Sequence, residues 1–386
     1  MCATKQGYEW GATCLRDHAR TVFTEEVELL RTLAQIPAPS GKEDQRAAFV
    51  LAWLRGAGAT CVEVDAHNNV LCWVSESQDA GVEVFSAHTD VVFDDLTPLP
   101  LREEGGRMYA PGVGDDTANL VGLLMGTRWL LAHPELTHGR SVLVVANSCE
   151  EGLGNLRGTR ALYERYSNRI ASHVVFDTTL GNVVREAVGS VRWRVSCDGP
   201  GGHSFKAYGA PNAIIELSRL ICALDAMELP SAAVTTRNVG TVTGGTTVNS
   251  IAAHAEMLFE LRSLNDACLK AATKTFEREV QACQARAHGV HFAYEAVGER
   301  PASALGVSPE LDALVKRACS ATRAATGSDT VNIAPSSTDA NIPLSRGIPA
   351  VCLGGVRGMG AHTRNEWIET ASLEDGLVAI LSMLKG

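Results

Sequence analysis

The order of apolar and polar positions changes character twice along the chain. In the first stretch, residues 141–146 form a nearly unbroken apolar run, which is typical of a buried parallel strand. Strands are also expected at 82–86 and 173–176, and segments with apolar residues at helical spacing separate these runs. Strands that alternate with helices predict an α/β domain with a mainly parallel central sheet flanked by helices.

Local signals predict where the helices of this stretch begin and end. A first helix is expected to begin at Thr24 and to end before Pro37. Residues 40–43, with the sequence Ser-Gly-Lys-Glu, predict a capping box at the start of a second helix. A glycine-rich turn then leads into an apolar helix over residues 117–131.

The pattern changes near Gly189. Residues 191–197 alternate strictly between apolar and polar, as a half-exposed antiparallel strand does. A helix, two strands, a helix and a strand are then expected over residues 211–227, 236–243, 254–262, 266–287 and 291–297. This β-α-β-β-α-β order predicts an α+β domain of the ferredoxin-like type.

After Pro301 the alternation of strands and helices returns and continues to a last helix at 373–384. The first domain is therefore expected to be discontinuous, because its pattern is interrupted and then resumed. It would comprise residues 1–187 and 300–386, with residues 188–299 as the inserted domain.

Composition and charge argue against several classes of function. The chain has 386 residues, enough for two domains, and its 45% hydrophobic content is that of a globular protein. A formal net charge of −10 argues against a nucleic-acid or membrane partner. The 11 cysteines include no C-x-x-C pair, which predicts reduced thiols rather than a disulfide framework. No segment resembles a signal peptide or a membrane span, so a soluble cytoplasmic protein is expected.

Acidic residues and histidines gather where the predicted strands end. The carboxyl ends of parallel strands meet at one edge of the sheet, where ligands bind in open α/β folds. Two imidazoles with several carboxylates suit zinc, cobalt or manganese, and they are too many for a single ion. Hydrogen-bonded surface pairs, such as a His-x-Asp pair, are the alternative. The candidates are His88, Asp90, Asp115, Glu150, Glu151, Asp177 and His362.

The adjacent residues Glu150 and Glu151 follow the most apolar strand. On an extended segment neighbouring side chains point apart, so one carboxylate can bind metal while the other faces a water molecule. This would place a general base beside a Lewis acid. A solvated acidic turn is the alternative. A Cys-His hydrolase built on Cys149 is disfavoured, because no histidine with an orienting partner accompanies this cysteine.

Together these motifs resemble those of the co-catalytic zinc metallopeptidases, the family that includes peptidase T, carboxypeptidase G, the dipeptidases and acetylornithine deacetylase. The resemblance covers nearly the whole chain in the expected order. It implies a zinc-exopeptidase-like catalytic domain with an inserted lid and dimerisation domain, and therefore a homodimer. The matching motifs are Pro37-Ala38-Pro39-Ser40-Gly41, His88-Thr89-Asp90, Gly114-Asp115-Asp116, Glu150-Glu151, Asp177 and His362.

The resemblance further implies a centre of two zinc ions, for which cobalt or manganese are alternatives. One zinc is bound by His88 and Asp177. The second zinc is bound by Glu151 and His362, and Asp115 bridges the two ions.

Catalytic roles are also implied by the resemblance. Glu150 is the general base that activates the bridging water, and Asp90 orients the ring of His88. The family often has a cis peptide bond after the bridging aspartate, here Asp115–Asp116. The chain departs from the family at Cys149, where a polar residue such as Asp or Thr is expected.

In the inserted domain, the sequence around His203 matches the lid motif of the family. The resemblance implies that His203 stabilises the oxyanion, typically in the active site of the partner subunit. Asn249 and Arg262 match substrate-binding residues, and an arginine suits a planar carboxylate. From the residues alone, a surface role for His203 and an ion pair between Arg262 and Glu260 remain open.

The expected activity is the hydrolysis of di- or tripeptides by an exopeptidase of the aminopeptidase or dipeptidase type. Asp177 favours this, because the aminopeptidases and dipeptidases of the family tend to have Asp there, whereas its deacylases and carboxypeptidases tend to have Glu. The lid motif is likewise closest to the peptidase T-like branch. The main alternative is an N-acyl-amino-acid amidohydrolase with the same site, and a catalytically silent binding protein is the alternative from another class.

Overall fold

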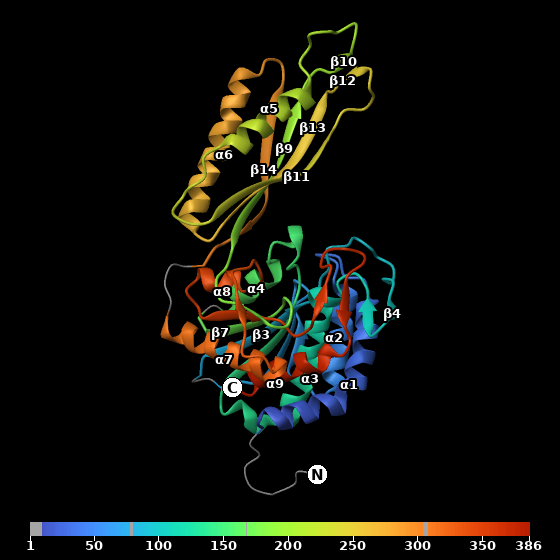
Figure 1. Cartoon of the computed structure of the whole chain (residues 1–386), viewed down its shortest axis with the longest axis vertical. Coiled ribbons are helices and arrows are strands. Elements are labelled where there is room, and N and C mark those ends of the chain that lie inside the picture. The colour runs from blue at the N-terminus through green and yellow to red at the C-terminus, as the bar shows by residue number, and fades with distance from the viewer. Residues whose placement is uncertain (1–9, 78–79, 167, 304–307) are drawn as a thin grey trace, which may run out of the picture. The chain divides into compact units, whose positions relative to one another are not determined.

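The computed structural model describes residues 10–77, 80–166, 168–303 and 308–386 (Figure 1). These residues form two compact units. The first consists of the described residues up to 186 and from 308 onward, and the second consists of residues 187–303. None of the helices within the described ranges is long and apolar enough to cross a membrane.

A mixed eight-stranded sheet forms the centre of the first unit, with the order β1-β2-β6-β3-β7-β16-β8-β15. Its middle strands β6, β3, β7 and β16 run parallel, whereas β1, β2 and β8 introduce antiparallel pairs toward the edges. The strands are β1 (Val62–Val64), β2 (Val70–Ser75), β3 (Val82–His88), β6 (Ser141–Asn147), β7 (Ile170–Phe176), β8 (Asn182–Val184), β15 (Asn332–Ile333) and β16 (Ala350–Leu353).

Helices flank this sheet (Figure 1). Helix α3 packs against β3 and is buried on nearly every side, which its uniformly apolar sequence allows. Helix α9 packs against α1, α3 and α7. The helices are α1 (Ala12–Ala34), α2 (Asp44–Gly56), α3 (Ala118–Ala132), α4 (Arg157–Tyr166), α7 (Pro309–Thr326), α8 (Asn341–Ser345) and α9 (Ser372–Leu384).

The first helix is longer than the sequence signals predicted. It begins at Ala12 rather than at Thr24, so the predicted start was wrong. Leu15 and Ala19 are buried at helical spacing with Leu30 further along the helix. Tertiary packing of this apolar stripe extends the helix past a residue that would otherwise suit a helix start.

The predicted capping box at residues 40–43 is also absent. Helix α2 begins at Asp44 without a hydrogen bond from a capping side chain. Ser40 Oγ instead donates to Asp90 at 2.6 Å, and Glu43 accepts the backbone N–H groups of Gly41 and Cys149 at 2.7 and 3.1 Å. Both side chains are therefore used by the loops at the end of the sheet.

A small antiparallel sheet of the first unit was not predicted, because its strands are too short to show a period of two. Its order is β17-β18-β5-β4. Ile368 lies opposite Met108, which brings the segment after His362 beside the loop that leads to Asp115. The strands are β4 (Arg102–Glu104), β5 (Arg107–Tyr109), β17 (Gly358–Met359) and β18 (Trp367–Glu369).

The second unit contains an antiparallel sheet with the order β11-β13-β9-β14, which is the ferredoxin-like arrangement (Figure 1). Its core includes Trp193, Phe259 and Phe276, and the ring centroids of Trp193 and Phe276 are 4.4 Å apart. The elements are β9 (Gly189–Asp198), β10 (Gly202–His203), α5 (Ala213–Ala226), β11 (Thr235–Gly244), β12 (Ser250–Ile251), β13 (His254–Ser263), α6 (Asp266–Arg286) and β14 (His291–Arg300).

Candidate metal centre

His88 is the last residue of β3, and its ring is held by Asp90. The Nδ1 atom of His88 lies 3.0 Å from the carbonyl oxygen of Asp90 and 3.4 Å from its carboxylate. Since a carbonyl oxygen can only accept a hydrogen bond, Nδ1 carries a hydrogen and Nε2 is directed to a different partner. That partner is Asp115, whose Oδ1 lies 3.0 Å from Nε2.

Asp115 lies between two imidazoles. Its Oδ1 faces His88, and its Oδ2 lies 3.1 Å from Nε2 of His362. The Asp115–Asp116 peptide bond is cis, and the carboxylate of Asp116 accepts the backbone N–H of His88 at 2.9 Å. The Asp116 side chain thus joins the loop before α3 to the backbone at the end of β3.

Three groups of side chains could hold a metal ion, one of His88, Glu150 and Glu151 and two that have Asp115 in common. In each group the possible ligand atoms lie within 4.8 Å of one another. The first of the two groups with Asp115 is His88, Asp115 and Asp177, and the second is Asp115, Glu151 and His362.

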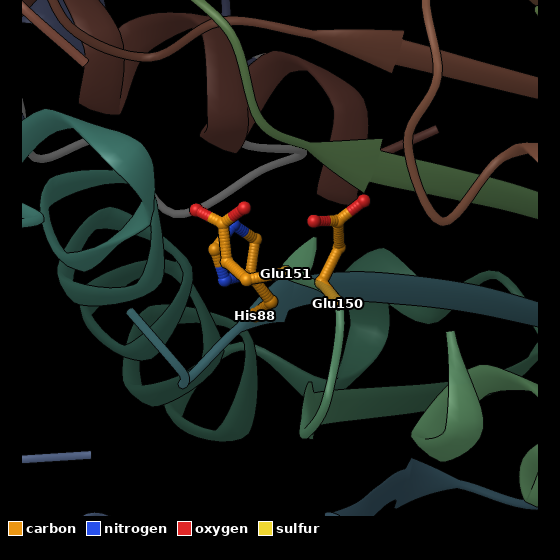
Figure 2. Close-up of side chains that lie close together, drawn as sticks. All are labelled: His88, Glu150 and Glu151. Carbon is orange, nitrogen blue, oxygen red and sulfur yellow. The ribbon is translucent and has the colours of Figure 1, made fainter. Parts of the chain in front are cut away.

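Glu150 and Glu151 lie on the same side of the chain (Figure 2). Each offers a carboxylate oxygen within 4.8 Å of a ring nitrogen of His88. Because the carboxylate oxygens of the two glutamates also lie within 4.8 Å of each other, the expectation that neighbouring side chains point apart was wrong here. Strand β6 has already ended at Asn147. The glutamate pair therefore does not follow the alternation of a strand.

Asp90 holds this glutamate pair as well as His88. Its two carboxylate oxygens accept the backbone N–H groups of Glu150 and Glu151, each at 2.9 Å, and Ser40 Oγ also donates to it. One buried carboxylate thus fixes a histidine ring and the backbone of both glutamates.

The charges within the cluster shift the pKa values of its members. Burial, with the charge on Asp115, raises the pKa of Glu151 to about 7 and raises that of Asp177 well above its usual range. The nearby carboxylates of Asp115 and Glu151 raise the pKa of His362 to about 10. The pKa of Asp115 is lowered, because its bonds to the imidazoles outweigh its burial. Carboxylates are therefore crowded in a buried place, where a cation would stabilise their ionised forms.

The donor set fits divalent metal ions. Oε1 of Glu151 is buried and receives no hydrogen bond of suitable geometry from any described residue, although His362 Nε2 lies 3.3 Å away. An oxygen in that position is suited to a metal ion. Imidazole and carboxylate ligands suit zinc, cobalt and manganese.

Cys149 is buried beside the glutamate pair. Its Sγ lies 3.2 Å from Glu43 Oε1 and 3.0 Å from Arg157 Nη2. Burial raises the pKa of the thiol to about 11, so it is protonated at neutral pH and is a poor nucleophile. The geometry therefore gives no support to a cysteine hydrolase.

The predicted functional residues of the second unit lie in two separate places. His203 and Asn249 are neighbours, because β10 pairs with β12 and Ser204 N–H donates to the carbonyl of Asn249 at 3.0 Å. Arg262 lies near the other end of β13, where Nε donates to Glu260 at 2.9 Å. The span of β13 from His254 to Arg262 is roughly 27 Å at the usual rise per residue.

Several residues that support the site were missed by sequence reasoning. Asp116 belongs to the motif Gly114-Asp115-Asp116, which was considered only for Asp115. This motif could therefore have signalled a role for Asp116. Glu366 follows His362 by a few residues in a segment without periodicity, and nothing in the sequence signals its partners. Asp339 joins β6 to α4 through hydrogen bonds with Asn147 and Thr159.

Comparisons with known proteins agree with this architecture. A curated relative, the succinyl-diaminopimelate desuccinylase of Corynebacterium glutamicum, is 26% identical over 370 residues, covering 92% of this chain and 95% of that protein. Aminopeptidase PepT from Bacillus cereus has a TM-score of 0.71 at 20% identity, with 96% of this chain and 98% of that chain covered. The dipeptidase Dug1p from Saccharomyces cerevisiae has a TM-score of 0.77 at 15% identity, with 98% of each chain covered. At these levels of sequence identity, the two solved structures show only that the fold is shared with this chain.

The family itself is shown by a match that spans most of the chain. Residues 84–386 match the model of peptidase family M20/M25/M40, which confirms the resemblance inferred from the motifs. The chain therefore belongs to peptidase family M20/M25/M40, and it is a metal-dependent hydrolase of peptide or amide C–N bonds.

Proposed function

We propose that this chain is an exopeptidase that hydrolyses di- or tripeptides at a centre of two divalent cations, with zinc as the expected metal. The position of Asp115 supports this most, because its two carboxylate oxygens face His88 and His362. A shared carboxylate of this kind is typical of hydrolytic sites with two metal ions.

Two sets of side chains would hold the cations, and Asp115 belongs to both. His88 and Asp177 complete the first set, and Glu151 and His362 complete the second. Divalent cations supply Lewis acidity, which polarises a scissile carbonyl and lowers the pKa of water.

Glu150 is the general base in this proposal. It lies beside His88 and Glu151 but belongs to neither set that contains Asp115. Its backbone N–H is held by Asp90, which fixes the point from which its side chain extends. The carboxylate takes a proton from the attacking water and returns it to the nitrogen of the leaving amine.

The second unit supplies groups for substrate binding. His203 donates to the developing oxyanion, and Asn249 and Arg262 bind the substrate carboxylate. An extended dipeptide spans roughly 7 Å, far less than the length of β13 between these groups. One copy of the chain therefore cannot direct all three at one substrate, which supports a homodimer in which His203 and Asn249 act on the site of the other copy.

A second candidate is an N-acyl-amino-acid amidohydrolase that uses the same residues. The curated relatives favour it, because their name describes removal of a succinyl group from an amine. Asp177 favours the peptidase, because the family's deacylases tend to have Glu at this position.

A substrate panel tests the proposal. The full-length protein would be assayed for metal content and for hydrolysis of dipeptides, tripeptides, N-acetyl amino acids and N-succinyl amino acids. We expect bound metal, cleavage of peptides with a free α-amine, and slower cleavage of blocked amino acids by a factor of about ten or more, because a site built to bind a polar group discriminates against substrates that lack it. Cleavage of the blocked compounds alone would establish the amidohydrolase instead, and absence of any hydrolysis by the metal-loaded protein would contradict both.

A further inference from the structure

Glu366 is a buried carboxylate that belongs to none of the candidate ligand groups. Its side chain is 2% exposed and accepts three backbone N–H groups from a single loop. Oε2 accepts from Gly112 at 2.8 Å, and Oε1 accepts from Gly114 at 2.7 Å and from Asp115 at 2.8 Å. Glu366 therefore holds the backbone of the residue that is shared between the two ligand groups.

The small sheet sets the position of Glu366. Strand β18 begins at the next residue and pairs with β5, and Ala110 N–H donates to the carbonyl of Glu366 at 3.2 Å. The loop from Gly112 to Asp115 follows directly and turns around the carboxylate. The position of Glu366 beside this loop is thus fixed by backbone pairing as well as by its side chain.

The loop approaches this carboxylate closely at a glycine. A Cβ atom on Gly114 would lie 3.0 Å from Glu366 Oε1, which is closer than ordinary contact. The backbone of Gly114 does not have a positive φ, so conformational freedom does not explain the glycine. The close approach of the Glu366 carboxylate explains it, together with that of Ile368, whose Cγ2 atom would lie 3.1 Å from the same Cβ atom.

Glu366 and His362 are carried by the same loop. His362 Nε2 contacts Asp115 Oδ2 at 3.1 Å, while Glu366 holds the backbone N–H of Asp115. One loop therefore contacts the side chain of Asp115 and fixes its main chain. If the main chain rotated, the carboxylate could not face His88 and His362 together.

We propose that Glu366 is a positioning residue that keeps Asp115 in the orientation needed for shared metal binding. This rests on the metal centre of the proposed function, but not on the identity of the substrate. Groups that orient metal ligands in this way control metal affinity, and their loss weakens it about 10–100-fold. A carboxylate that only stabilised the loop would change the stability of the fold and leave metal affinity as it was.

The test compares Glu366→Gln with Glu26→Gln in the full-length protein. Glu26 is a matched control, because it is another buried glutamate and lies in α1 outside the ligand groups. Metal-stripped protein would be titrated with Co²⁺ and followed by calorimetry and by visible absorption, which reports the ligand geometry. We expect about 10–100-fold weaker Co²⁺ binding and an altered spectrum for Glu366→Gln. Glu26→Gln should match the wild type in both.

A second variant reaches the same contact from the other side. Gly114→Ala keeps the carboxylate but pushes it away, so it should also weaken Co²⁺ binding and alter the spectrum. This variant serves as the test if Glu366→Gln does not fold. Wild-type affinity and spectrum in both Glu366→Gln and Gly114→Ala would overturn the proposal. If the wild-type chain itself bound no Co²⁺, the metal centre would fail with it, whereas failure of the peptide assay alone would leave the role of Glu366 intact.

Discussion

The two units of the molecule hold their candidate functional residues in opposite ways. In the first unit, buried carboxylates fix the backbone of the segments that carry the ligands: Asp90 holds the glutamate pair, Asp116 holds His88, and Glu366 holds Asp115. In the second unit, His203 and Asn249 are exposed. Arg262 is paired with Glu260 on its own strand.

Under the proposed function, this difference separates a cluster that one unit completes from groups that would act on a second copy. The first cluster contains its ligands and the carboxylates that orient them within one unit. The groups of the second unit are spread along its sheet, and no single small substrate could contact all of them. We therefore expect changes in the first unit to affect chemistry and metal binding, and changes in the second unit to depend on a second copy.

The largest effect is expected for Glu150→Gln. This variant removes the proposed general base while leaving both ligand sets that contain Asp115 unchanged, so kcat should fall about 10²–10⁴-fold or more. Metal content should remain that of the wild type. Turnover near the wild-type rate would show that another group accepts the proton.

His203→Ala should lower kcat about 10²–10³-fold, because a group directed at the oxyanion is lost. His254→Ala is the matched control, since His254 is also exposed on the second unit and pairs with Asp198 at 2.7 Å.

Mixing the Glu150→Gln and His203→Ala variants tests whether the two residues of one site come from the same copy of the chain or from different copies. If Glu150 and His203 of one site come from different copies, dimers formed by random exchange between Glu150→Gln and His203→Ala should recover about a quarter of wild-type activity. If both residues of a site come from the same copy, the mixture will remain inactive.

Glu26 is buried in α1 outside the candidate metal centre, so its pKa shows the effect of burial alone. Burial raises the pKa of this glutamate from 4.5 to about 8, so the folded state keeps a proton that the unfolded chain releases. Its contribution to stability is full below pH 4.5 and is lost as the pH rises toward 8, by up to about 1.4 kcal/mol per pH unit. Urea unfolding of Glu26→Gln between pH 5 and 8 should show a smaller loss of unfolding free energy than the wild type. Equal slopes would contradict the shift.

The smallest effect is expected for Arg262→Lys. Lysine keeps the charge but loses the planar pair of donors, so KM should rise about tenfold with little change in kcat. Arg194→Lys is the control, because Arg194 is an arginine of the neighbouring strand that pairs with Glu295 at 2.6 Å. A fall in kcat with KM unchanged would place Arg262 in the chemical step instead of in substrate binding.

Much of the fold could be predicted because local patterns carry it. The apolar run at β6 and the strict alternation along β9 follow directly from burial on two faces and on one face. The small sheet was missed because strands of two or three residues are too short to show a period. The start of α1 was misplaced because packing against other helices outweighed a local signal.

The sequence by itself determined which groups are available: two imidazoles and several carboxylates placed where strands end. It also determined the inserted order of elements, because periodicity is a local property. Only the tertiary structure decided that Asp115 lies between His88 and His362, and that both glutamates of the pair turn to the same side. It alone revealed Glu366 as the support of Asp115, because that contact depends on pairing between strands far apart in the chain. Distances of this kind are fixed by long-range register, which no local pattern encodes.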